Sequence, residues 1–316
     1  MNQKIIIDTD PGIDDALAIL FALAHPALDV VGLTTVFGNV PTALATENAL
    51  RIADVAEADI PVVRGAECPL LIAPHGHADF VHGEDGLGNT HQAPSLREAH
   101  ASNAAQFIVD QVRAAPDDIT LVPIGPLTNV ALALKLAPDI AKKTRVVLMG
   151  GAVHEPGNCS PVAEANIWQD PHAAEVVFAA DWHVTMVGLD ATHQVRLDQA
   201  FFDACEQAAP RIGGFLNKVH QFYLDFYASR FGERVCAAHD ALAVATVVDR
   251  SVVQTHTGAI RVCTNGVAEG QTLFAKPGRF DDQHWWRDRP QQDAALSADD
   301  KAARALILDT FTEFGM

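Results

Sequence analysis

Short apolar runs alternate with longer amphipathic segments through the first half of the chain, and this alternation restricts the possible folds most strongly. The short runs predict strands, and apolar residues at helical spacing predict helices between them. Strands separated by helices pair in parallel and are covered on both faces. We therefore expect an α/β protein with a mostly parallel sheet flanked by helices on both faces. The expected strands are residues 4–8, 29–35, 61–64, 119–123, 145–149 and 183–189, and the expected helices are residues 14–24, 41–56, 102–114, 127–136 and 170–179.

The second half of the chain is less regular. Residues 212–231 and 239–248 predict helices, and residues 259–262 and 271–274 predict short strands. Ser297 is a candidate cap for a final helix that ends near Phe314. No repeat or low-complexity linker divides the chain, so we expect a single domain over residues 1–316. Residues 66–94 and 276–295 are expected to be loops, the second with Trp285 and Trp286 as buried structural side chains.

Acidic residues outnumber basic ones by 40 to 22, which gives a net charge of −18. This balance argues against a nucleic-acid partner, because phosphate binding needs clustered Lys and Arg. It suits a neutral substrate, or carboxylates that hold a cation. No stretch approaches the ~20 apolar residues of a membrane span, and the first ten residues lack the features of a signal peptide. The five cysteines are scattered, which is typical of a reduced cytoplasmic protein, so we expect that location and no membrane partner.

Four aspartates lie close together where the first predicted strand ends: Asp8, Asp10, Asp14 and Asp15. Ligands of open α/β sheets bind outside the carboxyl ends of the strands. Asp14 alone would be explained as a residue that caps the following helix, but a cap does not account for the other three. Carboxylates this close repel one another unless a cation offsets their charge. The motif therefore predicts a site for a hard divalent cation, Ca²⁺ or Mg²⁺.

Two weaker features occur further along the chain. Asp240 precedes an apolar helix, where an Asp next to a His is usually a helix cap with a surface neighbour. A metal that still needs ligands makes Asp240 a candidate. A strand runs through Gly-Pro into a helix at residues 121–129, and the bend leaves the carbonyl of Ile124 free to bind a ligand. An ordinary strand-to-helix turn explains the same spacing, so both features remain open on these residues alone.

Several motifs together make the chain resemble the nucleoside hydrolases, the inosine–uridine-preferring N-ribohydrolase family. The opening DTDPGIDDA at residues 8–16 is highly specific to that family. Met-Gly-Gly at 149–151, Gly-Asn at 157–158, Ala-Glu-Ala-Asn at 163–166 and His-Asp at 239–240 follow in the family's order. The resemblance covers almost the whole chain and implies a nucleoside hydrolase-like (Rossmann-like) open sheet.

The resemblance also implies roles for individual residues. One Ca²⁺ per active site would be bound by Asp10, Asp15, Asp240 and the carbonyl of Ile124, together with two ribose hydroxyls and a water from which Asp10 takes a proton. Ribose contacts are implied for Asp14, Asn39, Met149, Asn158, Glu164 and Asn166. Base contacts are implied for His82, Tyr223, Tyr227 and His239. His82 and His239 are also candidate catalytic residues, with His239 the better candidate for the acid that protonates the leaving base.

These roles suit the hydrolysis of an N-glycosidic bond in a ribonucleoside. Positive charge develops on the ribose ring in the transition state, and carboxylate and amide oxygens stabilise it. The leaving base needs a proton or hydrogen bonds, and His titrates in the useful range. We therefore expect an enzyme that releases ribose and free base in nucleoside salvage, and the family implies a homodimer or homotetramer. By resemblance to pyrimidine-preferring members of the family, His82 together with His239 slightly favours uridine and cytidine, and purine-preferring or broad inosine–uridine activity is the alternative.

Two functions of other classes compete with this interpretation. Asp8 and Asp10 at the end of a first strand also suit a Mg²⁺-dependent haloacid-dehalogenase-type phosphatase, but Gly12 stands where that family has Thr or Val. A non-catalytic nucleoside-binding protein would keep the same contacts without turnover. Ala165 and Ala241 depart from residues common in the nucleoside hydrolases, which puts the specificity in doubt and leaves the metal set unchanged.

Overall fold

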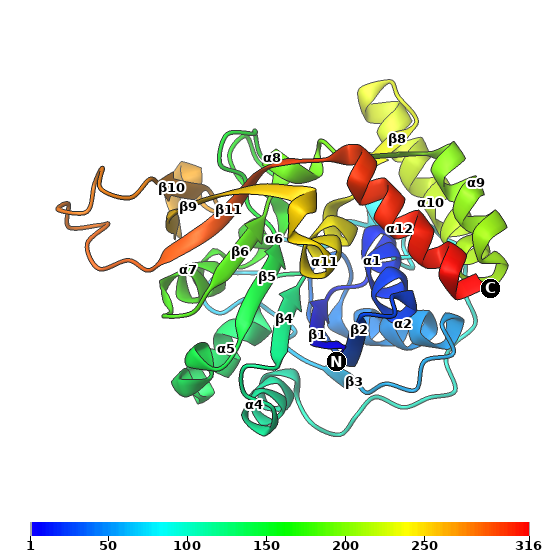
Figure 1. Ribbon diagram of the computed structural model, residues 1–316, viewed down its shortest axis with the longest axis horizontal. Helices are drawn as coiled ribbons and strands as arrows, with labels where there is room; N and C mark the ends of the chain where they lie inside the picture. The colour runs from blue at the N-terminus through cyan, green and yellow to red at the C-terminus, as the bar shows by residue number, and fades with distance from the viewer. Residues whose placement is uncertain (1, 316) are drawn as a thin grey trace.

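A nine-stranded sheet forms the centre of the computed structural model, which describes residues 2–315. The strand order is β10-β9-β11-β6-β5-β4-β1-β2-β3, and the strands from β6 to β3 are all parallel (Figure 1). β9 runs antiparallel to both β11 and β10. The mostly parallel sheet predicted from the sequence is confirmed. The strands are β1 (Gln3–Thr9), β2 (Leu28–Thr35), β3 (Val62–Arg64), β4 (Ile119–Pro123), β5 (Arg145–Met149), β6 (Val184–Val187), β9 (Val253–Val262), β10 (Thr272–Ala275) and β11 (Gln291–Ala298).

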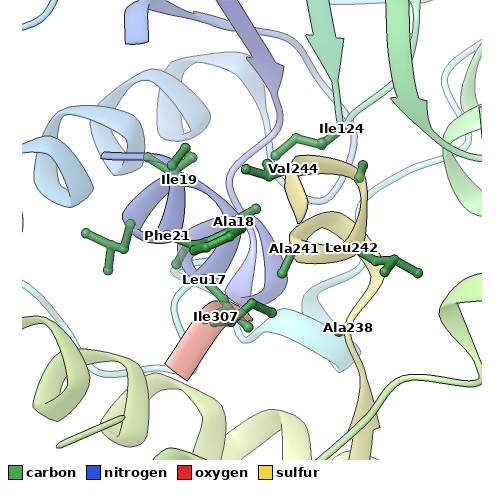
Figure 2. Close-up of a cluster of buried hydrophobic side chains, with 14 of the residues drawn as sticks. Leu17, Ala18, Ile19, Phe21, Ile124, Ala238, Ala241, Leu242, Val244 and Ile307 are labelled. Carbon is green, nitrogen blue, oxygen red and sulfur yellow. The ribbon is translucent and has the colours of Figure 1, made fainter. Parts of the chain in front are cut away.

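Helices cover both faces of this sheet, as the alternating pattern predicts. One face packs against α1, α2 and α9 to α12, and the other against α4, α5 and α7. Figure 2 draws part of the first core, where α1, α11 and α12 meet. The long helices are α1 (Ile13–Ala24), α2 (Thr42–Val55), α4 (Ala104–Ala114), α5 (Thr128–Leu136), α7 (Pro171–Ala179), α9 (Gln199–Ala208), α10 (Pro210–Phe231), α11 (His239–Val248) and α12 (Asp300–Gly315). Among the described helices, none is both long and apolar enough to cross a membrane.

β1 shows why a continuous apolar run forms a central strand. Ile5 and Ile7 point into the core beneath α1, whereas Ile6 points into the core on the opposite face. All three side chains are at most 1% exposed, and each such burial contributes roughly 1.5–3 kcal/mol. β1 pairs with β2 on one side and β4 on the other, so the residues that follow it lie at the carboxyl edge of the parallel part of the sheet, between the ends of β2 and β4.

The prediction of a loop over residues 276–295 is wrong at its end. Residues Gln291–Ala298 form β11, which lies between β6 and β9 inside the sheet. The sequence hides this strand because it contains buried polar residues: Asp293 accepts hydrogen bonds from Thr257 and Arg250, and Gln292 from the main chain of Val184. Ser297 also lies in β11, so it does not cap the final helix. That helix is capped by Asp299, whose Oδ1 accepts a hydrogen bond from the N–H of Ala302 (3.0 Å).

Several short elements were not predicted from the sequence. They are α3 (Asp79–His82) in the long loop, α6 (Ala165–Gln169), α8 (Leu189–Thr192) and the two-stranded sheet of β7 (Arg196–Asp198) and β8 (Val235–Ala237), together with the longer α9. The expectation that both tryptophans are buried is wrong, because Trp285 is 64% exposed. It lies in the segment between β10 and β11, which projects away from the sheet (Figure 1).

Candidate active site at the carboxyl edge of the sheet

Three aspartates from two helices meet where β1 ends. Asp14 and Asp15 stand in the first turn of α1, and Asp240 stands in the first turn of α11, which packs against α1. One carboxylate oxygen from each lies within 4.8 Å of the other two. Within residues 2–315, this is the one group of three or more His, Cys, Asp or Glu side chains close enough to share a metal ion. The two distant parts of the chain named as metal-binding candidates therefore do come together.

Asp10 lies beside this cluster, and the backbone holds it tightly. Its Oδ2 accepts a hydrogen bond from the N–H of Asn39 (2.6 Å), while its buried Oδ1 has no partner among residues 2–315. Two glycines enclose the carboxylate: a Cβ on Gly38 would come 2.0 Å from Oδ2, and a Cβ on Gly125 would come 2.5 Å from Oδ1. Gly38 also has a φ of +156°. Only residues without a side chain fit at these two positions, so the orientation of Asp10 is fixed by its surroundings.

Asp15 is oriented by three donors. The hydroxyl of Thr9 donates to its Oδ1, and the N–H of Gly12 (2.9 Å) and Nδ2 of Asn39 (3.2 Å) donate to its Oδ2. Asn39 therefore connects the two aspartates, because its main-chain N–H donates to Asp10 and its side-chain amide donates to Asp15. A carboxylate that is held by several fixed donors keeps its remaining lone pairs pointed in one direction, which preorganises a ligand site.

Burial raises the pKa of every acid in this group. It raises the pKa of Asp14 and of Asp15 to about 6, with the charge of Asp14 adding to the effect on Asp15. The pKa values of Asp10 and Asp240 are raised further, first by burial and then by the neighbouring aspartates. Desolvation is the main cause of these pKa shifts, and repulsion between like charges adds to it. A bound cation would offset both effects. Oxygen donors of this number and charge suit a hard divalent ion.

Ile124 and Met149 lie at the carboxyl ends of neighbouring strands and are linked by Asn166. Nδ2 of Asn166 lies 2.9 Å from the carbonyl oxygen of Ile124 and 3.2 Å from that of Met149. The same nitrogen lies 3.4 Å from the sulfur of Met149. The N–H of Ile124 donates to the carbonyl of Asp8 (2.7 Å), which holds the bend after β4 against β1. The structure thus brings these three candidate residues together beside Asp10.

Glu164 is buried and caps α6. Its Oε1 accepts from the N–H of Asn166 (3.0 Å), and its Oε2 accepts from those of Gly151 (2.9 Å) and Ile167 (3.1 Å). Burial raises its pKa to about 7. Asn158 is exposed, and its Oδ1 accepts from the N–H of Ala165 (2.9 Å). Both predicted ribose residues therefore organise the start of α6, a role that the sequence did not reveal.

His82 caps the start of α1 through its imidazole ring. Its Nδ1 accepts a hydrogen bond from the N–H of Ile13 (3.1 Å) and lies 3.8 Å from a carboxylate oxygen of Asp14. Its ring stacks on Tyr223 at a centroid distance of 5.5 Å. Burial lowers the pKa of His82 to about 4, so the ring is neutral near pH 7 and carries its proton on Nε2. His82 can therefore donate a hydrogen bond from Nε2 but is a poor source of protons.

His239 begins α11 and has a hydroxyl group at each ring nitrogen. Nδ1 lies 2.9 Å from Oγ1 of Thr192, and Nε2 lies 3.1 Å from the hydroxyl of Tyr227. Burial lowers the pKa of His239 to about 3. Tyr223 packs edge-on against Tyr227, and its hydroxyl lies 3.4 Å from Oδ2 of Asp14. The two tyrosines of α10 thus connect both histidines to the acidic cluster.

Asp8 lies outside the cluster although it shares the opening motif. Its Oδ1 accepts hydrogen bonds from Thr34 and from Nδ2 of Asn129 (2.8 Å), and it is 2% exposed. Burial raises its pKa to about 7. A buried carboxyl held in this way is a poor nucleophile, which counts against the phosphatase interpretation. Sequence reasoning missed Asn129 and Thr34, although Asn129 stands in the turn motif that drew attention to Ile124.

Comparison with known proteins agrees with this geometry. The family model of the inosine-uridine preferring nucleoside hydrolases matches residues 5–305. The fold and the site define a hydrolase that acts on N-glycosyl bonds. The chain belongs to the inosine–uridine preferring nucleoside hydrolase family, so the resemblance seen in its motifs is confirmed.

Individual relatives match over nearly their full length. A probable uridine nucleosidase of Arabidopsis thaliana is 40% identical over 316 residues, which cover 99% of this chain and 98% of the relative. An inosine-uridine preferring nucleoside hydrolase of Crithidia fasciculata is 41% identical over 327 aligned positions, covering 100% and 99%. A solved plant nucleoside hydrolase superposes with a TM-score of 0.95 at 38% identity and 99% coverage of both chains.

Proposed function

We propose that this enzyme is a Ca²⁺-dependent ribonucleoside hydrolase that releases ribose and free base, with uridine and cytidine slightly preferred. One observation carries the proposal: buried carboxylates from two helices converge beside Asp10, where burial and the charges of the neighbouring aspartates raise the pKa of Asp10 and of Asp240. The imidazole of His82, whose Nδ1 lies 3.8 Å from Asp14, is neutral near pH 7 because burial lowers its pKa to about 4. Buried carboxylates this close together must either take up protons or bind a cation, and a bound cation would keep them ionised near pH 7.

The residues fit a hard divalent ion. The buried Oδ1 of Asp10, which has no hydrogen-bond partner among residues 2–315, is free to bind one, and Asp15, Asp240 and the Ile124 carbonyl complete an all-oxygen donor set of the kind Ca²⁺ prefers. When bound, the ion supplies Lewis acidity and positive charge at the site. Asp14 also belongs to the cluster of closest carboxylate oxygens. We propose that Asp10 binds the ion and that Asp14 contacts the ribose.

The remaining steps belong to the side chains of this chain. Asp10, held in place by Asn39, Gly38 and Gly125, would accept a proton from the attacking water through its carboxylate. Asn39, Asn166 and Glu164 would surround the sugar with amide and carboxylate oxygens, which stabilise positive charge developing on the ribose ring. Met149 would line the sugar pocket, and Asn158 would reach it from the loop before α6.

The base would lie between His82, His239 and the tyrosines of α10. His82 would donate a hydrogen bond from Nε2 to the base. His239 would assist departure of the base through Tyr227, whose hydroxyl meets its Nε2. The uridine nucleosidase name of the Arabidopsis relative supports the preference for uridine and cytidine, and the inosine-uridine name of the Crithidia relative supports the broader alternative.

Reducing-sugar release from purified protein tests the function directly. We expect release from uridine, cytidine and inosine, strong loss with deoxyuridine because a ribose hydroxyl is missing, and loss of activity with EDTA that added Ca²⁺ restores. Binding of uridine without sugar release would instead support a non-catalytic binding protein. Mg²⁺-dependent hydrolysis of p-nitrophenyl phosphate with no action on nucleosides would support the phosphatase.

The remaining expectations concern the whole protein. We propose that residues 1–316 act as one domain, that the enzyme works as a homodimer or homotetramer in cytoplasmic nucleoside salvage, and that it has neither a nucleic-acid nor a membrane partner. The resemblance and the acidic composition support these proposals. Gel filtration with light scattering measures the oligomeric state.

A further inference from the structure

Asn48 of α2 is buried completely and contacts two main-chain segments of the site. Its Nδ2 donates hydrogen bonds to the carbonyl oxygens of Pro11 (3.3 Å) and Asp85 (2.9 Å). Its Oδ1 accepts a hydrogen bond from Nη1 of Arg51 (3.0 Å). Both amide hydrogens and the amide oxygen are therefore engaged, which fixes the side chain in one orientation.

The carbonyls of Pro11 and Asp85 belong to two different segments of the site. Pro11 lies in the turn that carries the aspartates of the acidic cluster. Asp85 lies in the loop directly after His82, and its carboxylate gathers the N–H groups of Leu87, Asn89 and His91 at 2.8 Å each. A loop tied together in this way moves as a unit, so a bond to the carbonyl of Asp85 restrains the whole segment.

Two neighbours on α2 strengthen the connection. Nε of Arg51 donates to the carbonyl of Ala93 (3.2 Å), and Glu47, which pairs with Arg51 at 3.1 Å, accepts from the N–H of Ser95 (2.9 Å). The fit around Asn48 is also close, because a Cβ on Gly86 would come 2.8 Å from its Nδ2. One face of α2 therefore anchors the segment from Asp85 to Ser95.

We propose that Asn48 is a positioning residue for base recognition: it sets His82 relative to the turn that carries Asp10 and Asp15. Asn48 touches neither proposed substrate nor metal, so it acts through the loop of His82. The inference rests on the proposed function, since it requires His82 to contact the base. This role predicts that replacing Asn48 lowers activity on substrates whose leaving group is a nucleobase. Cleavage of a glycosidic bond to a leaving group that needs no help should change little.

Comparison of two substrates tests this role. Uridine needs contacts to its base, whereas p-nitrophenyl riboside has a leaving group that needs no protonation. In Asn48→Leu, the ratio of kcat/KM for uridine to that for p-nitrophenyl riboside should fall by about tenfold, since small displacements of a positioned group have effects of this size. The half-saturating Ca²⁺ concentration should not change. Thr46→Val is the matched control, because Thr46 is a buried hydrogen-bonded residue of the same helix with no bond to the loop.

A double-mutant cycle separates positioning from loss of stability. If Asn48 acts through His82, then Asn48→Leu should lower the ratio no further in a His82→Ala background. Arg51→Met removes the donor to Oδ1 of Asn48 at the rim of the core and should lower the ratio by a smaller factor. This variant tests the role if Asn48→Leu does not fold. An equal fall for both substrates, or full additivity with His82→Ala, would overturn the positioning role. Absence of uridine hydrolysis by the wild type would overturn the proposed function instead.

Discussion

The imidazole Nδ1 of His82 accepts a hydrogen bond from the main-chain N–H of Ile13, the first residue of α1. A nitrogen that accepts a hydrogen bond carries no proton, so the neutral ring has its proton on Nε2. The bond also satisfies one of the free N–H groups at the helix start. His82 thus holds the aspartate-bearing helix in place and keeps one N–H donor for a ligand.

The tautomer of His82 can be measured directly. In ¹⁵N-labelled enzyme between pH 5.5 and 8, we expect the shifts of a neutral ring protonated on Nε2, because burial lowers the pKa of His82 to about 4. His82→Ala supplies the assignment. A ring that titrates within this range would contradict the described geometry.

Asp10 should be essential for turnover. Asp10→Ala should lower kcat by at least about 10²-fold, the usual contribution of a general base, and substrate binding should change less. Asp118→Asn is a suitable control, because the Asp118 side chain is half exposed and forms an ion pair with Lys4. Turnover of Asp10→Ala close to that of the wild type would remove Asp10 from the chemistry.

Gly125 should matter through the space it leaves for Asp10. Gly125→Ala would place a methyl group 2.5 Å from Oδ1 of Asp10 and should reduce kcat at least about tenfold by displacing the carboxylate. Gly214→Ala is the matched control, since Gly214 lies in α10 with its nearest neighbour at 3.7 Å. That change should leave activity unaltered and stabilise the helix by roughly 0.5–1 kcal/mol.

Stabilisation by Ca²⁺ should increase with pH. The folded-state pKa of Asp14 and of Asp15 is about 6, above the ordinary 3.8, so protonation stabilises the metal-free fold at low pH and this stability is lost as pH rises through about 6. Ca²⁺ binds the deprotonated acids. The rise in Tm on replacing EDTA by Ca²⁺ should therefore be larger at pH 8 than at pH 5.

The EDTA sample is measured at each pH because the buried histidines also make the stability of the fold depend on pH. Their contribution increases with pH, whereas that of Asp14 and Asp15 decreases. The pKa values of His82 and His239 are lowered, to about 4 and about 3, so their contribution to stability is present above pH 6.5 and is lost as the pH falls. That contribution cancels in the difference between the two samples. A Ca²⁺-induced shift that does not depend on pH would argue against the aspartate cluster as the binding site.

His239 should affect substrates according to their leaving groups. His239→Ala should reduce kcat/KM for uridine more than for p-nitrophenyl riboside, because only uridine needs help to release its base. Tyr227→Phe removes the hydroxyl that meets Nε2 and should give a smaller loss of the same kind. Equal losses for both substrates would count against a role in base departure.

Local sequence patterns were sufficient to place the acidic motif at the carboxyl edge of the sheet. Asp10 to Asp15 follow a buried strand, and in a parallel sheet such residues lie at the carboxyl edge. Asp240 is different, because no local pattern says that the start of α11 meets the start of α1. The family motifs bridged that gap, and the structure brings the two together.

The contacts that hold the site residues were not predictable in the same way. Asn48, Asn129 and Thr34 stand in ordinary helix and strand positions, and their importance depends on which main-chain groups arrive beside them from distant segments. Glu164 shows a related problem, since the same carboxylate serves a helix cap and a proposed ligand contact. β11 was missed because its buried polar side chains break the apolar pattern.

The position of β11 has a consequence for biosynthesis. This strand is the second-to-last element of the chain, yet it lies between β6 and β9 in the sheet. While a ribosome is still making the protein, the outer edge of β6 has no neighbour to pair with, and unpaired edges attract other chains. The edge of β6 can be paired only after β11 has been synthesised, so a chain that lacks β11 would expose a strand edge to which other chains can bind.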